Sequence, residues 1–276
     1  MTKVWFITGS NRGLGRAFAK EAVKRGDKVV AGTRKIKEGD SFYQNENVLP
    51  VKLDVTDDKQ IRDAVKQAIN KFGQIDILLN NAGYGMSGAL EETDEKQLKA
   101  LFEADYFGTV KMIKAVLPYM RKQRSGYILN IASQGGLMGF TGSTAYCSAK
   151  FAVVGLSQAL RSELAPFNIQ VSAVCPGSFR TDFRDSSSLK LASSEIDDYD
   201  KTPIHKAEKF LKENNHKQQG DPAKAAEFLY DMVEKENLPS RLLIGPDCIS
   251  GVLGDLAEQI KELNSYALKA SDTNFE

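Results

Sequence analysis

Short apolar runs alternate along the chain with longer segments in which apolar residues recur every three or four positions. The short runs have the continuous apolar character of strands buried on both faces of a parallel sheet. The longer segments have the periodicity of amphipathic helices. The predicted strands lie at residues 3–8, 29–31, 48–54, 76–79, 126–132, 169–175 and 241–244. The predicted helices lie at residues 14–26, 57–72, 94–123, 144–166, 222–235 and 250–268, with Pro118 expected to kink or end the third of them.

This alternation predicts an α/β fold: a single-domain, Rossmann-like, doubly wound parallel sheet of about seven strands with helices on both faces. No linker, repeat or change of composition marks a second domain. Residues 182–220 interrupt the rhythm, because they are polar and show only a patchy helical pattern near residues 204–214. A segment of this length predicts a substrate lid, with a mobile surface insertion as the alternative. We expect one domain over residues 1–250, lid included, and a C-terminal helix and tail over residues 251–276.

The composition is that of an ordinary globular protein, since 42% of the 276 residues are hydrophobic and 26% are charged. The formal net charge is +1, from 37 basic and 36 acidic residues, so nothing steers the chain toward nucleic acid or an anionic membrane. No run approaches about 18 apolar residues, and no transmembrane helix is expected. The N-terminus reaches Gly9 too early for a signal peptide.

Cysteine and histidine usage argues against several classes of site. The three cysteines are an odd number without C-x-x-C spacing, which predicts neither a disulfide framework nor a zinc site and favours the reducing cytoplasm. The two histidines, His205 and His216, lie in the polar segment and are expected to be solvated. A metal site and a Ser-His-Asp triad are therefore not expected.

A glycine-rich turn, Thr8-Gly-Ser-Asn-Arg-Gly-Leu-Gly15, joins the first predicted strand to the first predicted helix. Such a turn lets the backbone approach a pyrophosphate that lies on the helix N-terminus. The spacing differs from the literal G-x-G-x-x-G form, and glycines alone could merely shape the turn. Within a strand–helix–strand unit, however, the turn predicts a dinucleotide site. Its residues are Gly9, Asn11, Arg12, Gly13, Leu14 and Gly15.

The end of the second predicted strand bears on which dinucleotide binds. It reads Gly32-Thr33-Arg34, without the acidic residue that would accept hydrogen bonds from a ribose 2′-hydroxyl and repel a 2′-phosphate. Arg12 and Arg34 could instead bracket a 2′-phosphate through charge-assisted hydrogen bonds. Two solvated surface arginines are the alternative. We predict NADP(H) in preference to NAD(H).

Tyr146 and Lys150 are four residues apart in a predicted helix, so both side chains project from the same face. A cation near a phenol favours the phenolate and lowers a pKa that is ordinarily about 10. Tyr146 is therefore a candidate proton carrier near neutral pH. Because Y-x-x-x-K pairs are common among surface neighbours on helices, the pair alone identifies no site.

Five motifs follow one another in the chain: the glycine turn, Asn80-Asn-Ala-Gly83, Ser133, Tyr146-x-x-x-Lys150 and Pro176-Gly177. In this order and spacing the sequence resembles a short-chain dehydrogenase/reductase. The resemblance covers about residues 3–180 by motif and extends to about residue 250 by its strand–helix rhythm. The finer resemblance is to the hydroxysteroid- and retinol-dehydrogenase-like reductases.

The resemblance implies a role for each matching residue. Ser133 would hydrogen-bond the substrate oxygen, Tyr146 would give or take the proton, and Lys150 would lower the pKa of Tyr146 and hold the nicotinamide ribose. Asp54 would meet the adenine amino group. Further cofactor contacts are implied for Val55, Asn81, Ala82, Gly83, Pro176, Gly177 and Thr181.

One residue departs from the family's pattern. Where the family usually carries an asparagine that holds a water in a proton relay with the lysine, this chain has Asp105. An aspartate can hold a water, but its negative charge could also weaken the effect of Lys150 on Tyr146, or the side chain could point elsewhere. We include Asp105 among the candidate catalytic residues.

The implied activity is hydride transfer between NADP(H) and the carbonyl or hydroxyl carbon of a small substrate. Apolar residues near the site favour a fairly apolar ketone, aldehyde or alcohol, although they could equally be core packing. The apolar residues near the predicted site, which favour an apolar substrate, are Leu137, Met138, Phe140, Phe179 and Phe183. A rival hypothesis is an NADP-binding redox sensor or scaffold without turnover.

The helices at residues 94–123 and 144–166 are apolar on more than one face, and with the resemblance they predict a homodimer or homotetramer.

Overall fold

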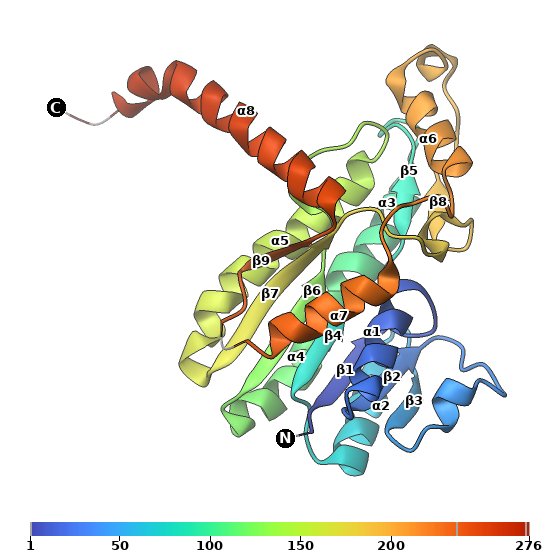
Figure 1. Cartoon of the computed structure of the whole chain (residues 1–276). Helices are drawn as coiled ribbons and strands as arrows, with labels where there is room; N and C mark the ends of the chain where they lie inside the picture. The colour runs from blue at the N-terminus through green and yellow to red at the C-terminus, as the bar shows by residue number, and fades with distance from the viewer. Residues whose placement is uncertain (1, 236, 274, 276) are drawn as a thin grey trace.

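The computed structural model describes residues 2–235, 237–273 and 275. Its centre is a sheet of seven parallel strands in the order β3-β2-β1-β4-β6-β7-β9 (Figure 1). The chain begins in the middle of this sheet and winds outward in both directions, which confirms the predicted doubly wound α/β fold. The strands are β1 (Val4–Thr8), β2 (Lys28–Thr33), β3 (Val48–Lys52), β4 (Ile77–Asn80), β6 (Gly126–Ile131), β7 (Ile169–Pro176) and β9 (Arg241–Ile244).

Two apolar layers, one on each face of the sheet, form most of the core. Successive strand side chains point to opposite faces, so Trp5 and Ile7 lie in one layer and Val4 and Phe6 in the other. All of β1 is buried, which explains why it is apolar at nearly every position. The first layer packs against α1 (Gly13–Lys24) and α7 (Pro222–Val233), and the second against α2 (Asp58–Phe72), α4 (Gly108–Gln123) and α5 (Thr144–Leu164).

The predicted helix at residues 94–123 is interrupted. It consists of α3 (Glu95–Phe102), one π-helical turn (Glu103–Phe107) and α4. Of the two expectations for Pro118, a kink or the end of the helix, the second is wrong, because α4 continues through Pro118 to Gln123. The irregular turn lies instead around Asp105. Single π-helical turns inside longer helices frequently occur at functional sites.

The lid region contains more structure than its polar sequence predicts. β8 (Leu189–Leu191) pairs in parallel with β5 (Gly85–Ser87), which follows β4 closely in the chain. Helix α6 (Pro203–Glu213) then matches the predicted helical segment near residues 204–214 to within one residue at each end. The two three-residue strands went unpredicted because each is too short to show a period.

The last helix is longer than its sequence pattern predicts. Helix α8 (Pro246–Ser271) begins four residues before the predicted start, since Pro246 is at its first turn, where a missing N–H costs little. Its far end projects away from the sheet (Figure 1). None of the helices in the described part of the chain is both long and apolar enough to span a membrane.

Candidate active site

The glycine turn lies at the carboxyl end of β1 and is held there by Asn81. The side-chain amide of Asn81 donates hydrogen bonds to the carbonyl oxygens of Thr8, at 3.0 Å, and Gly9, at 3.1 Å. Gly9 has a φ of 66°, a conformation that side chains disfavour. A Cβ on Gly15 would lie 2.4 Å from both the Asn81 amide and the Gly9 carbonyl oxygen. The turn therefore requires glycine for its own packing as well as for any ligand.

The N-terminus of α1 fits an anionic group. Its first residue follows Arg12, whose side chain makes no capping hydrogen bond. By contrast, aspartate side chains cap the first turns of three other helices: Asp57 caps α2, Asp94 caps α3 and Asp221 caps α7. The first N–H groups of α1 and the positive end of its dipole are thus left for a ligand at the carboxyl edge of the sheet. This is the geometry that a dinucleotide pyrophosphate requires.

Ser133, Tyr146 and Lys150 come together at the same edge of the sheet. Ser133 follows β6, and its hydroxyl accepts a hydrogen bond of 3.0 Å from the N–H of Gly135. Tyr146 and Lys150 lie in the first two turns of α5, and the Lys150 ammonium is 5.7 Å from the centre of the Tyr146 ring. The ammonium also donates a hydrogen bond of 3.1 Å to the carbonyl oxygen of Ile131. The structure therefore brings the three predicted residues into one group.

The ionisation of Tyr146 is set by opposing effects. Burial raises the pKa of the phenol above its ordinary value, while the charge of Lys150 and a hydrogen bond with Ser133 lower it. The nearby Asp105 adds a further raising effect. The net direction is upward, so the expected lowering by Lys150 is present but does not prevail in the protein alone.

Asp105 points at Lys150. One carboxylate oxygen lies 3.0 Å from the Lys150 ammonium, and the other accepts a hydrogen bond of 3.0 Å from the N–H of Tyr84. Both side chains are almost completely buried. Burial raises the pKa of Asp105 despite the opposing charge of Lys150. For Lys150, burial lowers the pKa, but Asp105 and Tyr146 outweigh it and the net direction is upward.

Gly83 explains how Asp105 fits. A Cβ on Gly83 would lie 2.9 Å from a carboxylate oxygen of Asp105, so the approach depends on glycine. The preceding asparagines have structural contacts of their own. The amide of Asn80 donates a hydrogen bond of 2.8 Å to Asn130 on β6, while the backbone N–H groups of Asn81 and Ala82 both donate to the Thr8 hydroxyl at 2.9 Å. The segment thus joins the sheet, the glycine turn and Asp105.

The two arginines assigned to a 2′-phosphate have different surroundings. Arg34 directly follows β2 and is exposed. Arg12 reaches across to the lid, where its guanidinium donates to the hydroxyls of Ser187 and Ser188 and, at 3.2 Å, to the Ser187 carbonyl oxygen. Arg12 therefore connects the glycine turn to the segment beside β8. The two serines lie 175 and 176 positions after Arg12 in the sequence, so the local sequence gave no signal for this connection.

The remaining predicted cofactor residues lie along the same edge. Thr181 packs beside the glycine turn, since a Cβ on Gly13 would lie 3.5 Å from the Thr181 Cβ. Pro176 ends β7, and Gly177 has Asp247 so close that a Cβ would lie 2.1 Å from its carboxylate. Asp54 and Val55 follow β3; the Asp54 carboxylate accepts a hydrogen bond of 2.8 Å from the Thr56 hydroxyl, and Val55 is buried.

A sequence model of the short chain dehydrogenase family matches residues 3–192. The match covers more than half of the chain and includes the glycine turn, Ser133, Tyr146 and Lys150. The chain belongs to the short-chain dehydrogenase family. It is therefore an oxidoreductase of this type, as its motifs predicted.

Two relatives match nearly their whole length. Oxidoreductase BOA17 of Botryotinia fuckeliana is 42% identical over 252 residues, which cover 90% of this chain and 91% of the relative. The 3-ketodihydrosphingosine reductase of Bacteroides thetaiotaomicron is 36% identical over 252 residues, 88% of each chain.

Solved structures confirm the fold and include both nicotinamide dinucleotides. A short-chain dehydrogenase from Streptomyces avermitilis has a TM-score of 0.92 and 35% identity over the whole of both chains. ElxO with NADP bound has a TM-score of 0.74 and 28% identity over 91% of this chain and all of that one. A family member from Burkholderia phymatum in complex with NAD has a TM-score of 0.80 and 24% identity over 94% of this chain and 95% of that one.

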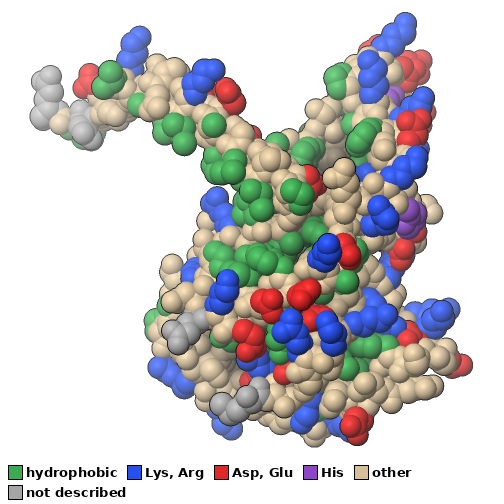
Figure 2. Space-filling model, in the orientation of Figure 1, with side chains coloured by type: hydrophobic (Ala, Val, Ile, Leu, Met, Phe, Trp, Pro, Cys, Tyr) green, Lys and Arg blue, Asp and Glu red, His purple; other side chains and the backbone are tan. Residues whose placement is uncertain are grey.

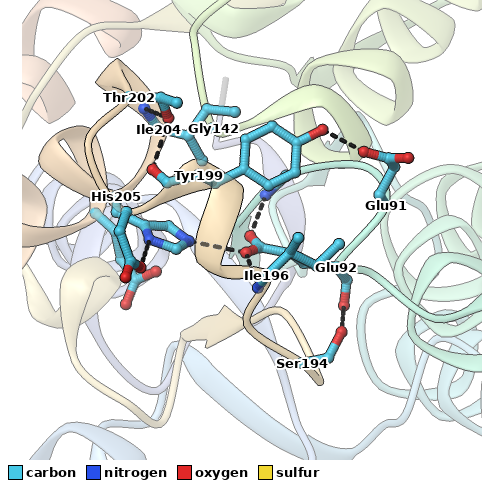
Figure 3. Close-up of polar contacts among 12 residues, drawn as sticks. Glu91, Glu92, Gly142, Ser194, Ile196, Tyr199, Thr202, Ile204 and His205 are labelled. Atoms are coloured by element: carbon cyan, nitrogen blue, oxygen red, sulfur yellow. Dashed lines mark hydrogen bonds and ion pairs between the residues drawn. The ribbon is translucent and has the colours of Figure 1, made fainter.

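Sequence reasoning missed the contacts that hold the predicted lid, residues 182–220, against the rest of the chain. His205, expected to be solvated, is only 19% exposed at its side chain, and its Nε2 lies 2.8 Å from the buried carboxylate of Glu92 (Figure 3). The same carboxylate accepts hydrogen bonds of 2.9 Å from the N–H groups of Ala89 and Ile196. Glu92 and His205 are 113 positions apart, and neither belongs to a motif. We call Glu92, Ile196 and His205 the lid latch.

Aromatic side chains near the site divide into two groups. Phe183 lies 5.9 Å from Tyr146, measured between ring centres, and is 39% exposed. Phe140 is similarly exposed. Phe179 is buried in the layer under α1 and α7, so for this residue the core-packing alternative is the correct one.

Proposed function

We propose that this protein transfers a hydride between NADP(H) and the carbonyl or hydroxyl carbon of a small, fairly apolar substrate. The observation that carries the proposal is the convergence of Ser133, Tyr146, Lys150 and Asp105 beside the glycine turn. These groups come from three separate parts of the chain, and both charged members are buried at the carboxyl edge of the sheet. Ligands of open α/β sheets bind at this edge.

Each of these side chains has a separate role in carbonyl reduction. A bound nicotinamide supplies the hydride. As negative charge develops on the substrate oxygen, the Ser133 hydroxyl donates a hydrogen bond and Tyr146 donates its proton. Lys150 favours the phenolate that remains, because its charge lowers the Tyr146 pKa. In the oxidative direction the same phenolate accepts the proton.

Asp105 is a positioning residue in this scheme. It holds the ammonium of Lys150 through their 3.0 Å ion pair and is itself oriented by the Tyr84 N–H. It need not bind a relay water to act in this way. Its charge has a cost for catalysis, since it raises the Tyr146 pKa that Lys150 lowers.

A preference for NADP(H) follows from the end of β2. Gly32 and Thr33 occupy the place of an acidic residue, and Arg34 stands exposed immediately after them. NADP binding by ElxO supports this preference, while the NAD complex shows that the fold accepts either cofactor. Arg12 completes the phosphate site only if it exchanges its serine partners in the lid for the phosphate.

Arg34→Ala tests the preference. We expect the variant to bind NADPH about ten- to a hundredfold more weakly, because it loses one or two charge-assisted hydrogen bonds to the 2′-phosphate. Binding of NADH should change little. Equilibrium titration of the cofactor fluorescence measures both dissociation constants. Lys224→Ala, on the exposed surface of α7, is the control. Equal or tighter binding of NADH by the unmodified protein would exclude the preference.

The substrate is proposed to be apolar because exposed aromatic rings, Phe183 above all, stand beside Tyr146. The match to a 3-ketodihydrosphingosine reductase supports a ketone substrate, since that relative's name describes a keto compound. A panel of ketones and aldehydes with increasing alkyl chain length tests this point. We expect kcat/KM for NADPH-dependent reduction to rise with chain length.

A redox sensor without turnover is the second candidate. The raised pKa of Tyr146 and the negative charge of Asp105 favour it, because both oppose formation of the phenolate. Measuring NADPH oxidation over the same panel separates the two functions. The enzyme proposal requires turnover of at least one carbonyl compound, whereas tight NADPH binding without any turnover supports the sensor.

We further propose a cytoplasmic homodimer or homotetramer with α4 and α5 at an interface. Three rings are exposed on these helices or next to them: Phe107, directly before α4, and Phe151 on α5 are each 46% exposed, and Tyr119 on α4 is 37% exposed. Apolar rings in such a setting are typical of surfaces covered by another subunit.

A further inference from the structure

Helix α8 is anchored to the body only near its start. Cys248 and Val252 are buried in a small apolar cluster with α5 and β7. The helix then continues to Ser271, and its 26 residues correspond to about 39 Å at 1.5 Å per residue. Beyond the anchor it stands clear of the rest of the molecule (Figure 1).

One continuous apolar stripe runs from the anchored start of α8 along its projecting part. Ile249, Leu253, Leu256, Ile260 and Leu263 are 45%, 62%, 41%, 59% and 52% exposed. Together with Ala267 they are spaced alternately by four and three residues, which is the a and d spacing of a coiled-coil heptad. We call these six residues the α8 seam. A stripe with this period fits the groove of another helix, rather than a flat surface.

The residues around the seam favour a partner with the same sequence. The flanking e and g positions, from Ala257 to Tyr266, are uncharged, so two copies of α8 would meet without repulsion. Charged residues occupy the outer positions of the helix. In Figure 2 the apolar side chains line the lower side of α8 and most charged ones its upper side. The outer charges are Asp255, Glu258, Lys261, Glu262 and Lys269.

A lipid surface fits this helix less well. α8 has four acidic residues, Asp247, Asp255, Glu258 and Glu262, against two lysines, Lys261 and Lys269. A helix that lies on an anionic membrane is instead rich in Lys and Arg on its polar face. The charge balance therefore leaves a helix as the better occupant.

We propose that the α8 seam pairs with the α8 seam of a second copy of this chain. A two-fold axis brings identical surfaces together, and a seam with Leu and Ile at its core positions is self-complementary under that symmetry. This interface is separate from the one proposed at α4 and α5. If both exist, the assembly is a tetramer in which α8 joins two dimers.

The molar mass of the full-length protein tests the pairing. The chain has a mass of 30.4 kDa, and light scattering after size exclusion is expected to give at least twice that value. The double variant Leu256→Asp/Leu263→Asp, which places charges in the seam, should halve the mass: from dimer to monomer, or from tetramer to dimer. The variant should fold, because both side chains are exposed in the single chain, and circular dichroism checks this.

Leu268→Asp is the matched control. Leu268 is on the same helix and is 91% exposed, but it occupies an outer position beside the seam. It should leave the mass unchanged. A monomeric unmodified protein, a seam variant with unchanged mass, or equal disruption by Leu268→Asp would each overturn the proposal. So would a monomer that sediments with phosphatidylcholine vesicles in a seam-dependent way, since lipid would then be the occupant.

Discussion

At the scale of single residues, Asp105 offsets part of the effect of Lys150 on the pKa of Tyr146. The carboxylate and the ammonium are 3.0 Å apart and nearly free of solvent, so little screening separates them. Asp105 therefore fixes Lys150 in place and at the same time offsets its charge. The π-helical turn at Glu103–Phe107 contains Asp105.

Asp105→Asn should shift the pH dependence of alcohol oxidation to lower pH. Removing a negative charge that raises the Tyr146 pKa favours the phenolate, and the oxidative direction needs the phenolate to accept a proton. The acid limb of kcat/KM against pH measures the change. Glu103→Gln, in the same π-helical turn but paired with Lys111, is the control. An unchanged profile for Asp105→Asn would remove Asp105 from the site.

Sequence reasoning predicted that Ser133, Tyr146 and Lys150 lie close together, and the structure brings them together because each lies in or just after a recognisable strand or helix. The carboxyl ends of parallel strands meet at one edge, so Ser133 after β6 and the glycine turn after β1 had to lie close together. The sequence could not show whether the pKa of Tyr146 is raised or lowered overall. The direction depends on how deeply the phenol is buried, and a motif carries no information about burial. The lid partners of Arg12 were equally invisible, because two serines in a polar segment carry no pattern.

At the scale of elements, the predicted lid, residues 182–220, contacts the rest of the described chain at three places among others. β8 pairs with β5, Arg12 donates to Ser187 and Ser188, and the lid latch joins His205 to Glu92. All three contacts are polar. The sequence predicted a helical segment near residues 204–214, which α6 matches to within one residue at each end, but a strand pair of three residues on each side is too short for periodicity to reveal.

The lid latch should loosen as the pH rises. The hydrogen bond with Glu92 raises the pKa of His205, and Asp200 adds to this effect. The stabilisation is therefore complete below the ordinary pKa of histidine, about 6.5, and is lost as the pH rises through the raised value. Hydrogen exchange of residues 192–202, corrected for its intrinsic pH dependence, should show less protection at pH 9 than at pH 6.

Variants identify the group responsible. His205→Gln should abolish this difference between the two pH values, whereas His216→Gln should retain it, because His216 is 53% exposed and pairs with Asp185 elsewhere in the lid. Equal protection at both pH values in the unmodified protein would show that the latch does not depend on His205 ionisation.

At the scale of the whole molecule, Asp27 ties the beginning of the chain to α7. Its buried carboxylate accepts hydrogen bonds from the Lys3 N–H and the Trp5 indole, both at 2.8 Å, and from the Tyr230 hydroxyl at 2.9 Å. The rings of Trp5 and Tyr230 also stack, with centres 5.7 Å apart. Because Asp27 and Tyr230 are 203 positions apart, this network holds two distant parts of the chain together on one face of the sheet.

Tyr230→Phe should destabilise the protein by roughly 1.5–3 kcal/mol, the range for a hydrogen bond to a charged group. The ring stacking is kept, so the change isolates the hydroxyl. Urea unfolding followed by circular dichroism gives the difference. Tyr119→Phe, whose ring is 37% exposed on α4, should change stability by less than about 0.5 kcal/mol. Similar values for the two variants would mean that the Asp27 network contributes little.

Tyr146→Phe provides the most direct test of the central claim, that Tyr146 carries the proton in an NADP(H)-dependent carbonyl reduction. The measurement is the rate of NADPH oxidation with the best carbonyl substrate from the panel, beside the NADPH dissociation constant. We predict a loss of kcat of about a hundredfold or more, the usual contribution of a general acid, with NADPH still bound. A variant that keeps the kcat of the unmodified protein would contradict the account.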